Sequence, residues 1–165
     1  MTDLAGTIRV RSARALAAHL AAAPSVTSGL YAWCAALGIG AGPIRVLARS
    51  GGAAPPALAA MLGEEAASAA FRRVVLGRGN IALAEADNLF LPARLPAAMR
   101  ARLERTDEPF GAVIAPIAPV RRTVTCETDE GPMAGAVLVQ TALLHAPDGT
   151  LIAAVAERFL PVLLR

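Results

Sequence analysis

The chain has 165 residues, which fits a single domain over residues 1–165 and lets folding bury roughly 70% of the surface of the unfolded chain. Its 55% apolar content is largely alanine. No apolar run reaches the length of about 18 residues that a transmembrane helix needs, so the sequence excludes insertion into a membrane. The net charge of +3 comes from arginines spread along the chain, and aromatic residues make up only 4%. This pattern argues against a nucleic-acid partner and favours attraction of a small anion.

The N-terminal stretch MTDLAGTIRVRSAR places Asp3 and arginines where a secretory signal would be apolar, so we expect a cytoplasmic protein. Cys34 and Cys126 have no second Cys or His at ligand spacing, and we expect both to be free thiols in or near the core. The sequence therefore predicts no metal and no cofactor. We expect a monomer that binds a small molecule.

The N-terminal part of the chain is expected to be helical. Residues 11–23 are rich in helix formers and stop at Pro24. Ser25 and Thr27 are candidate N-caps for a second helix over 29–37, which the glycines from Gly38 onward end. A weak strand over 44–48 follows, and residues 56–67 fit either a helix or an irregular apolar arm.

The rest of the chain is dominated by predicted strands. Apolar, β-branched segments bounded by turn residues predict strands at 71–76, 81–90, 110–117, 120–127, 136–145 and 150–160, with one helix at 96–105. Pro147, Asp148 and Gly149 predict a type I turn with glycine in the left-handed position. Because tight turns join these strands without a helix after each, the sequence predicts an antiparallel sheet in an α+β fold.

Two charged residues, adjoined by Arg73 and Arg158, stand in mostly apolar strands. Arg72 lies in FRRVVL and Glu157 in LIAAVAERFL, where a charge needs a partner or solvent. Strand alternation places Arg72 on the face of Val74, and Glu157 on the face of Val155. If both faces line one pocket, an Arg and a Glu meet there. An ordinary ion pair between strands, or a charge that points to solvent, is the alternative.

The order of several short motifs resembles the chorismate lyase family. The family's strand of the form L-R-E followed by apolar residues, its T-P-L-G-type turn and its terminal T-E-L-F-L-P strand are similar to FRRVVL, EPFG and AERFLP here. SVT at residues 25–27 resembles the family's short S-M-T segment, and Val120-Arg-Arg122 falls between the turn and the last strand. The resemblance covers the C-terminal half best. It implies an antiparallel sheet with helices packed on one side, covering a buried ligand pocket.

The resemblance also implies roles for individual residues. Arg72 and Glu157 fall on the family's substrate-binding arginine and catalytic glutamate. The further substrate-binding positions that it implies are Val26, Phe110, Gly111 and Arg122.

The activity that the resemblance implies is conversion of chorismate to 4-hydroxybenzoate and pyruvate, an early step of ubiquinone synthesis. Arginine suits a substrate carboxylate, and Glu157 could exchange a proton with the ether or developing hydroxyl oxygen. The alternative is a UTRA-like module that binds a small aromatic acid without chemistry. Such modules normally follow a DNA-binding winged helix, for which we expect no room before Arg72. A degenerate relative without catalysis is the third possibility.

Overall fold

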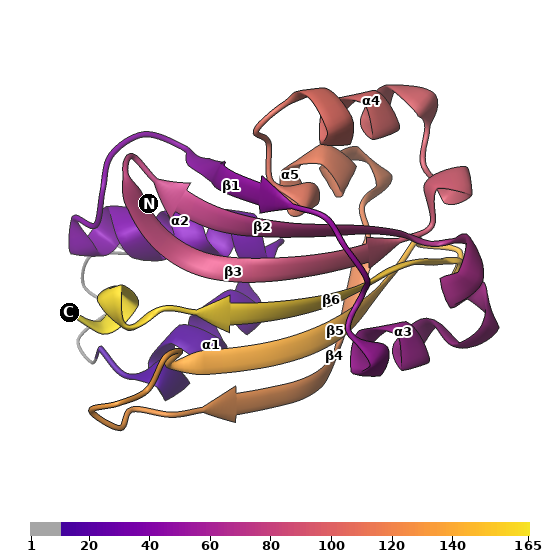
Figure 1. Cartoon of the computed structure of the whole chain (residues 1–165). Coiled ribbons are helices and arrows are strands. Elements are labelled where there is room, and N and C mark those ends of the chain that lie inside the picture. Colours follow the sequence, from indigo (N-terminus) through magenta and orange to yellow (C-terminus); the bar gives the residue numbers. More distant parts are fainter. Residues whose placement is uncertain (1–10) are drawn as a thin grey trace.

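The computed structural model of the chain describes residues 11–165, so most of the N-terminal stretch that argues against a secretory signal lies outside the described residues. The described part forms one six-stranded antiparallel sheet with helices against it, which confirms the predicted α+β class (Figure 1). The helices are α1 (Ala13–Ala22), α2 (Val26–Leu37), α3 (Pro56–Leu62), α4 (Ala97–Arg105) and α5 (Phe110–Ile114). The strands are β1 (Ile44–Ser50), β2 (Ala70–Arg78), β3 (Ile81–Phe90), β4 (Val120–Thr128), β5 (Leu138–His145) and β6 (Leu151–Phe159).

The sheet consists of two halves, each made of strands that are consecutive in sequence. The strand order is β1-β2-β3-β6-β5-β4, so β3 and β6 join the halves. Their paired residues run from Ala84 with Phe159 to Phe90 with Ala153. Gly149 closes the β5–β6 hairpin at a φ of +89°, as the sequence predicts. The two halves therefore meet along one strand pair in the middle of the sheet.

Helices cover the sheet unequally. On the face that we call inner, α1 and α2 pack over one end and α4 and α5 over the other. Figure 1 shows α1 and α2 behind the strands. The prediction of helices on one side holds for these four, but α3 packs on the outer face through Leu58 and Leu62. The inner face is therefore the enclosed one, as a buried site requires. Within residues 11–165, no helix has the length and apolar character needed to cross a membrane.

One predicted strand is a helix. Residues 110–117 form α5 followed by a 3-10 turn over Ala115–Ile117. The short apolar run FGAVI fits a buried strand or a buried helical turn equally well, because periodicity does not separate the two at this length. The helical form places Phe110, Val113 and Ile114 in the core. It also brings α5 against the start of α2.

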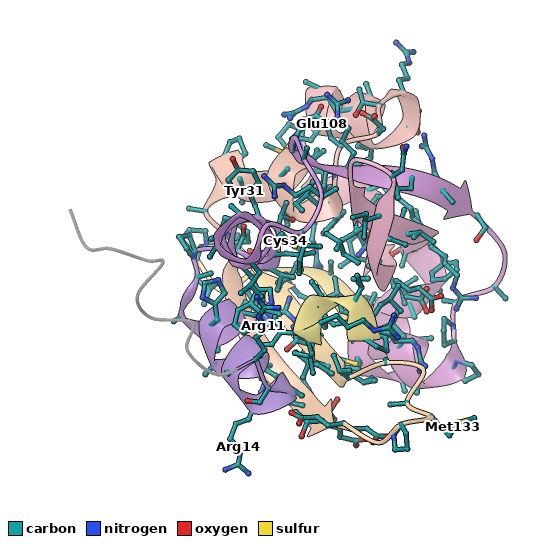
Figure 2. All side chains as sticks on the ribbon, turned by 90° about the vertical axis from the view of Figure 1, so that its left-hand side faces the viewer. Arg11, Arg14, Tyr31, Cys34, Glu108 and Met133 are labelled. Atoms are coloured by element: carbon teal, nitrogen blue, oxygen red, sulfur yellow. The ribbon has the colours of Figure 1, made fainter. Side chains whose placement is uncertain are left out.

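The two cysteines are both free thiols, as predicted, but they differ in position. Cys34 of α2, labelled in Figure 2, is fully buried, and burial raises the pKa of its thiol to about 11. Cys126 is exposed on β4, which is an edge strand, so the expectation of a core position is wrong for this residue.

Candidate functional site

The inner face holds a cavity of about 740 Å³ between the sheet and the starts of α2 and α5. This volume suits a small organic ligand. Most of its wall is apolar, and the apolar side chains that line it include Val26, Val74, Leu76, Phe110, Ile114, Leu144 and Val155. The polar lining residues include Asn88, Arg121, Thr123 and Glu157.

The start of α2 forms one wall of the cavity. Ser25 and Ser28 form a reciprocal capping box that fixes where the helix begins, and both line the cavity. A helix N-terminus carries partial positive charge and favours an anion nearby. Gly111 of α5 lies against this turn, because a Cβ on it would come within 3.0 Å of Thr27 Oγ1. Glycine therefore allows α5 to approach α2 and complete the wall.

Arg72 lies beside the cavity, across from the lining residue Asn88, and is only 5% exposed. Its Nη2 donates to the Glu108 main-chain oxygen at 3.0 Å, and its Nε and Nη1 have no hydrogen-bond partner among the described residues. Glu108, on the segment between α4 and α5 at the top of Figure 2, directs its carboxylate to Arg102 instead. Burial, with the positive charge of Arg49, lowers the pKa of Arg72 to about 10. Arg72 is thus a buried cation without an acidic partner in the described chain.

The neighbours of Arg72 connect it to the cavity. Arg72 itself does not contribute to the lining, but Val74 on the same face of β2 does. Asn88, directly across from Arg72 on β3, also lines the cavity, and its buried Oδ1 has no partner in the part of the chain described. This part of the site therefore contains unpaired donors on Arg72 and an unpaired acceptor on Asn88. Accepting atoms of a ligand could satisfy the charged donors of Arg72, which are the costlier groups to leave unpaired.

Glu157 marks the other end of the cavity and is 8% exposed. Its Oε2 accepts from Arg121 Nη2 at 2.6 Å and from Gln140 Nε2 at 2.9 Å, while Oε1 lies 3.3 Å from Arg121 Nη1. This arrangement holds Glu157 as a paired carboxylate whose Oε1 retains capacity to accept another hydrogen bond. Arg121 and Glu157 are the two charged side chains that line the cavity.

The two polar ends lie on neighbouring halves of the sheet. Arg72 pairs with Asn88, Asn88 with Val155, and Glu157 is two residues beyond Val155. Two strand spacings and two residue steps separate the backbone positions of Arg72 and Glu157 by roughly 12 Å. The cavity of about 740 Å³ beside them is large enough for a single substituted ring.

The structure brings together most of the positions that the resemblance implies. Val26, Phe110, Gly111 and Glu157 line the cavity, and Arg72 lies immediately behind its wall. The shared face of Arg72 with Val74, and of Glu157 with Val155, agrees with strand alternation. Arg72 and Glu157 do not pair with each other.

Arg122 is the predicted site residue that the structure places elsewhere. It is exposed and lies across from Leu143, which packs on the outer face, whereas Arg121 lies across from Leu144, which lines the cavity. A shift of one residue along a strand moves a side chain to the opposite face. The prediction for Arg122 is therefore corrected to Arg121.

A second hollow, of about 510 Å³, lies on the outer face. Four of its five charged residues form pairs: Arg73 holds Asp87 through two hydrogen bonds, and Arg158 lies 3.7 Å from Glu85. Such exposed pairs are common surface features and contribute little energy. The fifth, Arg49, donates to main-chain oxygens of Leu103 and Glu104. Within residues 11–165, no group of three or more His, Cys, Asp or Glu side chains could hold a metal. The inner cavity is therefore the stronger candidate site.

No family model and no curated protein sequence matches the chain. Among solved structures, PhnF from Mycobacterium smegmatis is similar, with a TM-score of 0.51 and 16% identity over 86% of this chain and 65% of PhnF. The effector domain of PhnF gives a TM-score of 0.46 and 14% identity over 72% of this chain and 80% of that domain. The ligand-binding domain of a GntR-family transcriptional regulator from Bordetella bronchiseptica gives a TM-score of 0.41 and 12% identity over 72% of this chain and 82% of that domain.

The similarity to PhnF concerns the fold. At 16% identity it shows that this chain shares the α+β fold found in PhnF, and the chain spans 65% of the PhnF chain. The chorismate lyase family remains a resemblance carried by short motifs.

Proposed function

We propose that this domain is a ligand-binding module whose inner cavity takes a small ring compound bearing a carboxylate. The observation that carries the proposal is the burial of Arg72 directly behind the cavity wall, with its Nε and Nη1 unpartnered by the described residues. Burial of an unpaired charge is costly, and proteins retain it mainly where it has a role.

A carboxylate is the ligand group that best suits this arginine. Nη2 donates one of its two hydrogens to the Glu108 oxygen, so the fork that uses its other hydrogen, together with Nε or Nη1, is left for a planar carboxylate to accept two parallel hydrogen bonds. The capped start of α2 adds partial positive charge to the same cavity. The apolar walls formed by Phe110, Ile114 and Val155 suit a ring between the polar ends.

The proposal is tested with 4-hydroxybenzoate and its uncharged relative 4-hydroxybenzamide, which has nearly the same shape. Isothermal titration calorimetry on the wild-type chain should show binding of the acid. The amide should bind at least tenfold more weakly, because a charge-assisted hydrogen bond contributes about 1.5–3 kcal/mol. Equal affinities for acid and amide, or no binding of the acid, would contradict the proposal.

Chorismate lyase activity is the second candidate function. It is favoured by the gathering of Val26, Phe110, Gly111 and Glu157 around one cavity beside Arg72, since the resemblance implies a role for each of these positions. In this candidate Arg72 anchors a carboxylate and Glu157 exchanges a proton with the ether or hydroxyl oxygen. The pairing of Glu157 with Arg121 and Gln140 argues against lyase activity, because its carboxylate already accepts hydrogen bonds from both residues.

The two functions are separated by incubating the purified chain with chorismate and measuring 4-hydroxybenzoate and pyruvate. A lyase forms both in equal amounts, and Glu157→Gln should then lower turnover by roughly 10²-fold or more, the usual scale for loss of an acid–base group. A wild-type chain that binds 4-hydroxybenzoate but leaves chorismate intact is a binding module.

A further inference from the structure

Three charged side chains lie in or directly beside the cavity. Arg121 and Glu157 line it, and Arg72 lies behind its wall. Arg121 is bound to Glu157 at 2.6 Å, with 24% and 10% of the two side chains exposed, so this pair is largely shielded from solvent. The site therefore contains two positive charges and one negative charge, and the negative one is at the end farther from Arg72.

We infer that the Arg121–Glu157 pair is a specificity device that makes the site select ligands with one negative charge over ligands with two. This inference rests on the proposed function. Arg72 balances a single ligand carboxylate, while Glu157 repels a second carboxylate at the opposite end of the ring. Glu157 Oε1 instead favours a hydrogen-bond donor, such as a hydroxyl, at that end.

The contribution of Arg121 is electrostatic and is distinct from a contact with the ring. Without Arg121, Glu157 would be a buried carboxylate with only Gln140 to stabilise it, and the field at the far end would be more negative. Without Glu157, Arg121 would present an unpaired guanidinium there and attract a second carboxylate. The sign of the charge change, and not only the loss of a side chain, should decide which ligand binds.

The test uses 4-hydroxybenzoate as the singly charged probe and benzene-1,4-dicarboxylate as the doubly charged probe. The measured quantity is the ratio of their dissociation constants in the wild type, Arg121→Gln, Glu157→Gln and the double variant. Arg122→Gln is the matched control, because Arg122 is adjacent in sequence but exposed on the other side of β4. Thermal melting verifies that each variant is folded.

The wild type should prefer the singly charged acid by at least roughly tenfold, the scale expected for a few ångströms' separation of partly buried charges. Glu157→Gln should shift the ratio toward the dicarboxylate by about tenfold, and Arg121→Gln should shift it the other way by a similar factor. The double variant restores the charge count, so its ratio should return to within about threefold of the wild type. Arg122→Gln should leave the ratio unchanged.

The inference is overturned if both single variants keep the wild-type ratio, or if the double variant keeps the shift of either single one. Because the two single variants move the ratio in opposite directions, one folded variant suffices to test the sign. If the wild type binds both acids equally, this inference is contradicted, whereas the proposed function is not. A wild type that binds neither acid removes the proposed function as well. Chorismate carries two carboxylates, so strong preference for one charge would also weigh against the lyase candidate.

Discussion

The two ends of β2 each carry a buried arginine, and their surroundings are opposite. Arg78 donates from Nε to the Gly42 oxygen at 2.8 Å and from Nη1 to the oxygens of Ile39 and Gly40 at 3.0 and 3.2 Å. Its guanidinium also lies over the ring of Tyr31, 5.1 Å from the centroid. Arg72, at the other end, makes one hydrogen bond and leaves Nε and Nη1 without a partner in the described chain.

This difference separates an arginine that builds the fold from one that serves a site. Arg78 satisfies main-chain carbonyls of the loop after α2, so its burial is compensated by the protein itself. Arg72 has fewer partners than its burial requires, and it lies beside Val74 and Asn88, which line the inner cavity. Variants of both residues, and of Arg73 beside Arg72, test this difference.

The largest effect is expected for Arg78→Met. The change leaves three main-chain oxygens without their donor, and it should lower the free energy of unfolding by about 3–4 kcal/mol. For a chain of this size that corresponds to a fall of roughly 10 °C in melting temperature. Calorimetric or circular dichroism melting measures it, and a loss below about 1 kcal/mol would show that Arg78 is not structural.

The next effect concerns ligand binding. Arg72→Ala should weaken binding of 4-hydroxybenzoate by about a hundredfold, because a charge-assisted pair with a carboxylate is lost. Arg73→Ala should change the affinity by less than about threefold, since Arg73 projects from the opposite face and binds Asp87. Titration calorimetry on both variants decides it. Equal losses of affinity would contradict the assignment of Arg72 to the site.

A smaller effect of opposite sign is expected for Arg72→Met in the absence of ligand. Replacing a buried, unpaired cation by an apolar side chain of similar length should raise the free energy of unfolding by about 1–2 kcal/mol. Urea denaturation measures the change. Destabilisation instead would mean that the hydrogen bond to the Glu108 oxygen makes Arg72 a structural residue like Arg78.

The smallest effect is expected for the outer face. Arg73→Ala removes a surface ion pair in which the arginine side chain is 52% exposed, and it should change stability by less than about 1 kcal/mol. The same denaturation experiment serves as the readout. A larger loss would show that the Arg73–Asp87 pair on the outer face stabilises the sheet and is more than a surface ion pair.

Sequence reasoning predicted the framework of the site better than its details. Alternation within FRRVVL and LIAAVAERFL placed Arg72 on the face of Val74 and Glu157 on the face of Val155, as the structure has them. The turn at Gly149 was predictable because its residue types fit one turn geometry. These features depend on local sequence alone.

The missed features depend on partners that are distant in sequence. Choosing Arg121 over Arg122 requires the pairing of β4 with β5, which two adjacent arginines in an edge strand do not reveal. Asn88 could have been noticed as a polar residue in the apolar run NLFLP, yet its position beside Arg72 follows only from the β2–β3 register. The helical form of α5 depends on its packing in the core and against α2, which outweighs its strand-like composition.

The division of the sheet into two halves has a consequence for local unfolding. Arg72 and Asn88 belong to the half formed by β1, β2 and β3, whereas Arg121 and Glu157 belong to the half formed by β4, β5 and β6. A ligand that spans the cavity therefore connects the halves across the β3–β6 seam. Because it binds only when the seam is closed, it should suppress separation of the halves, and amide hydrogens of β3 and β6 should exchange more slowly in its presence.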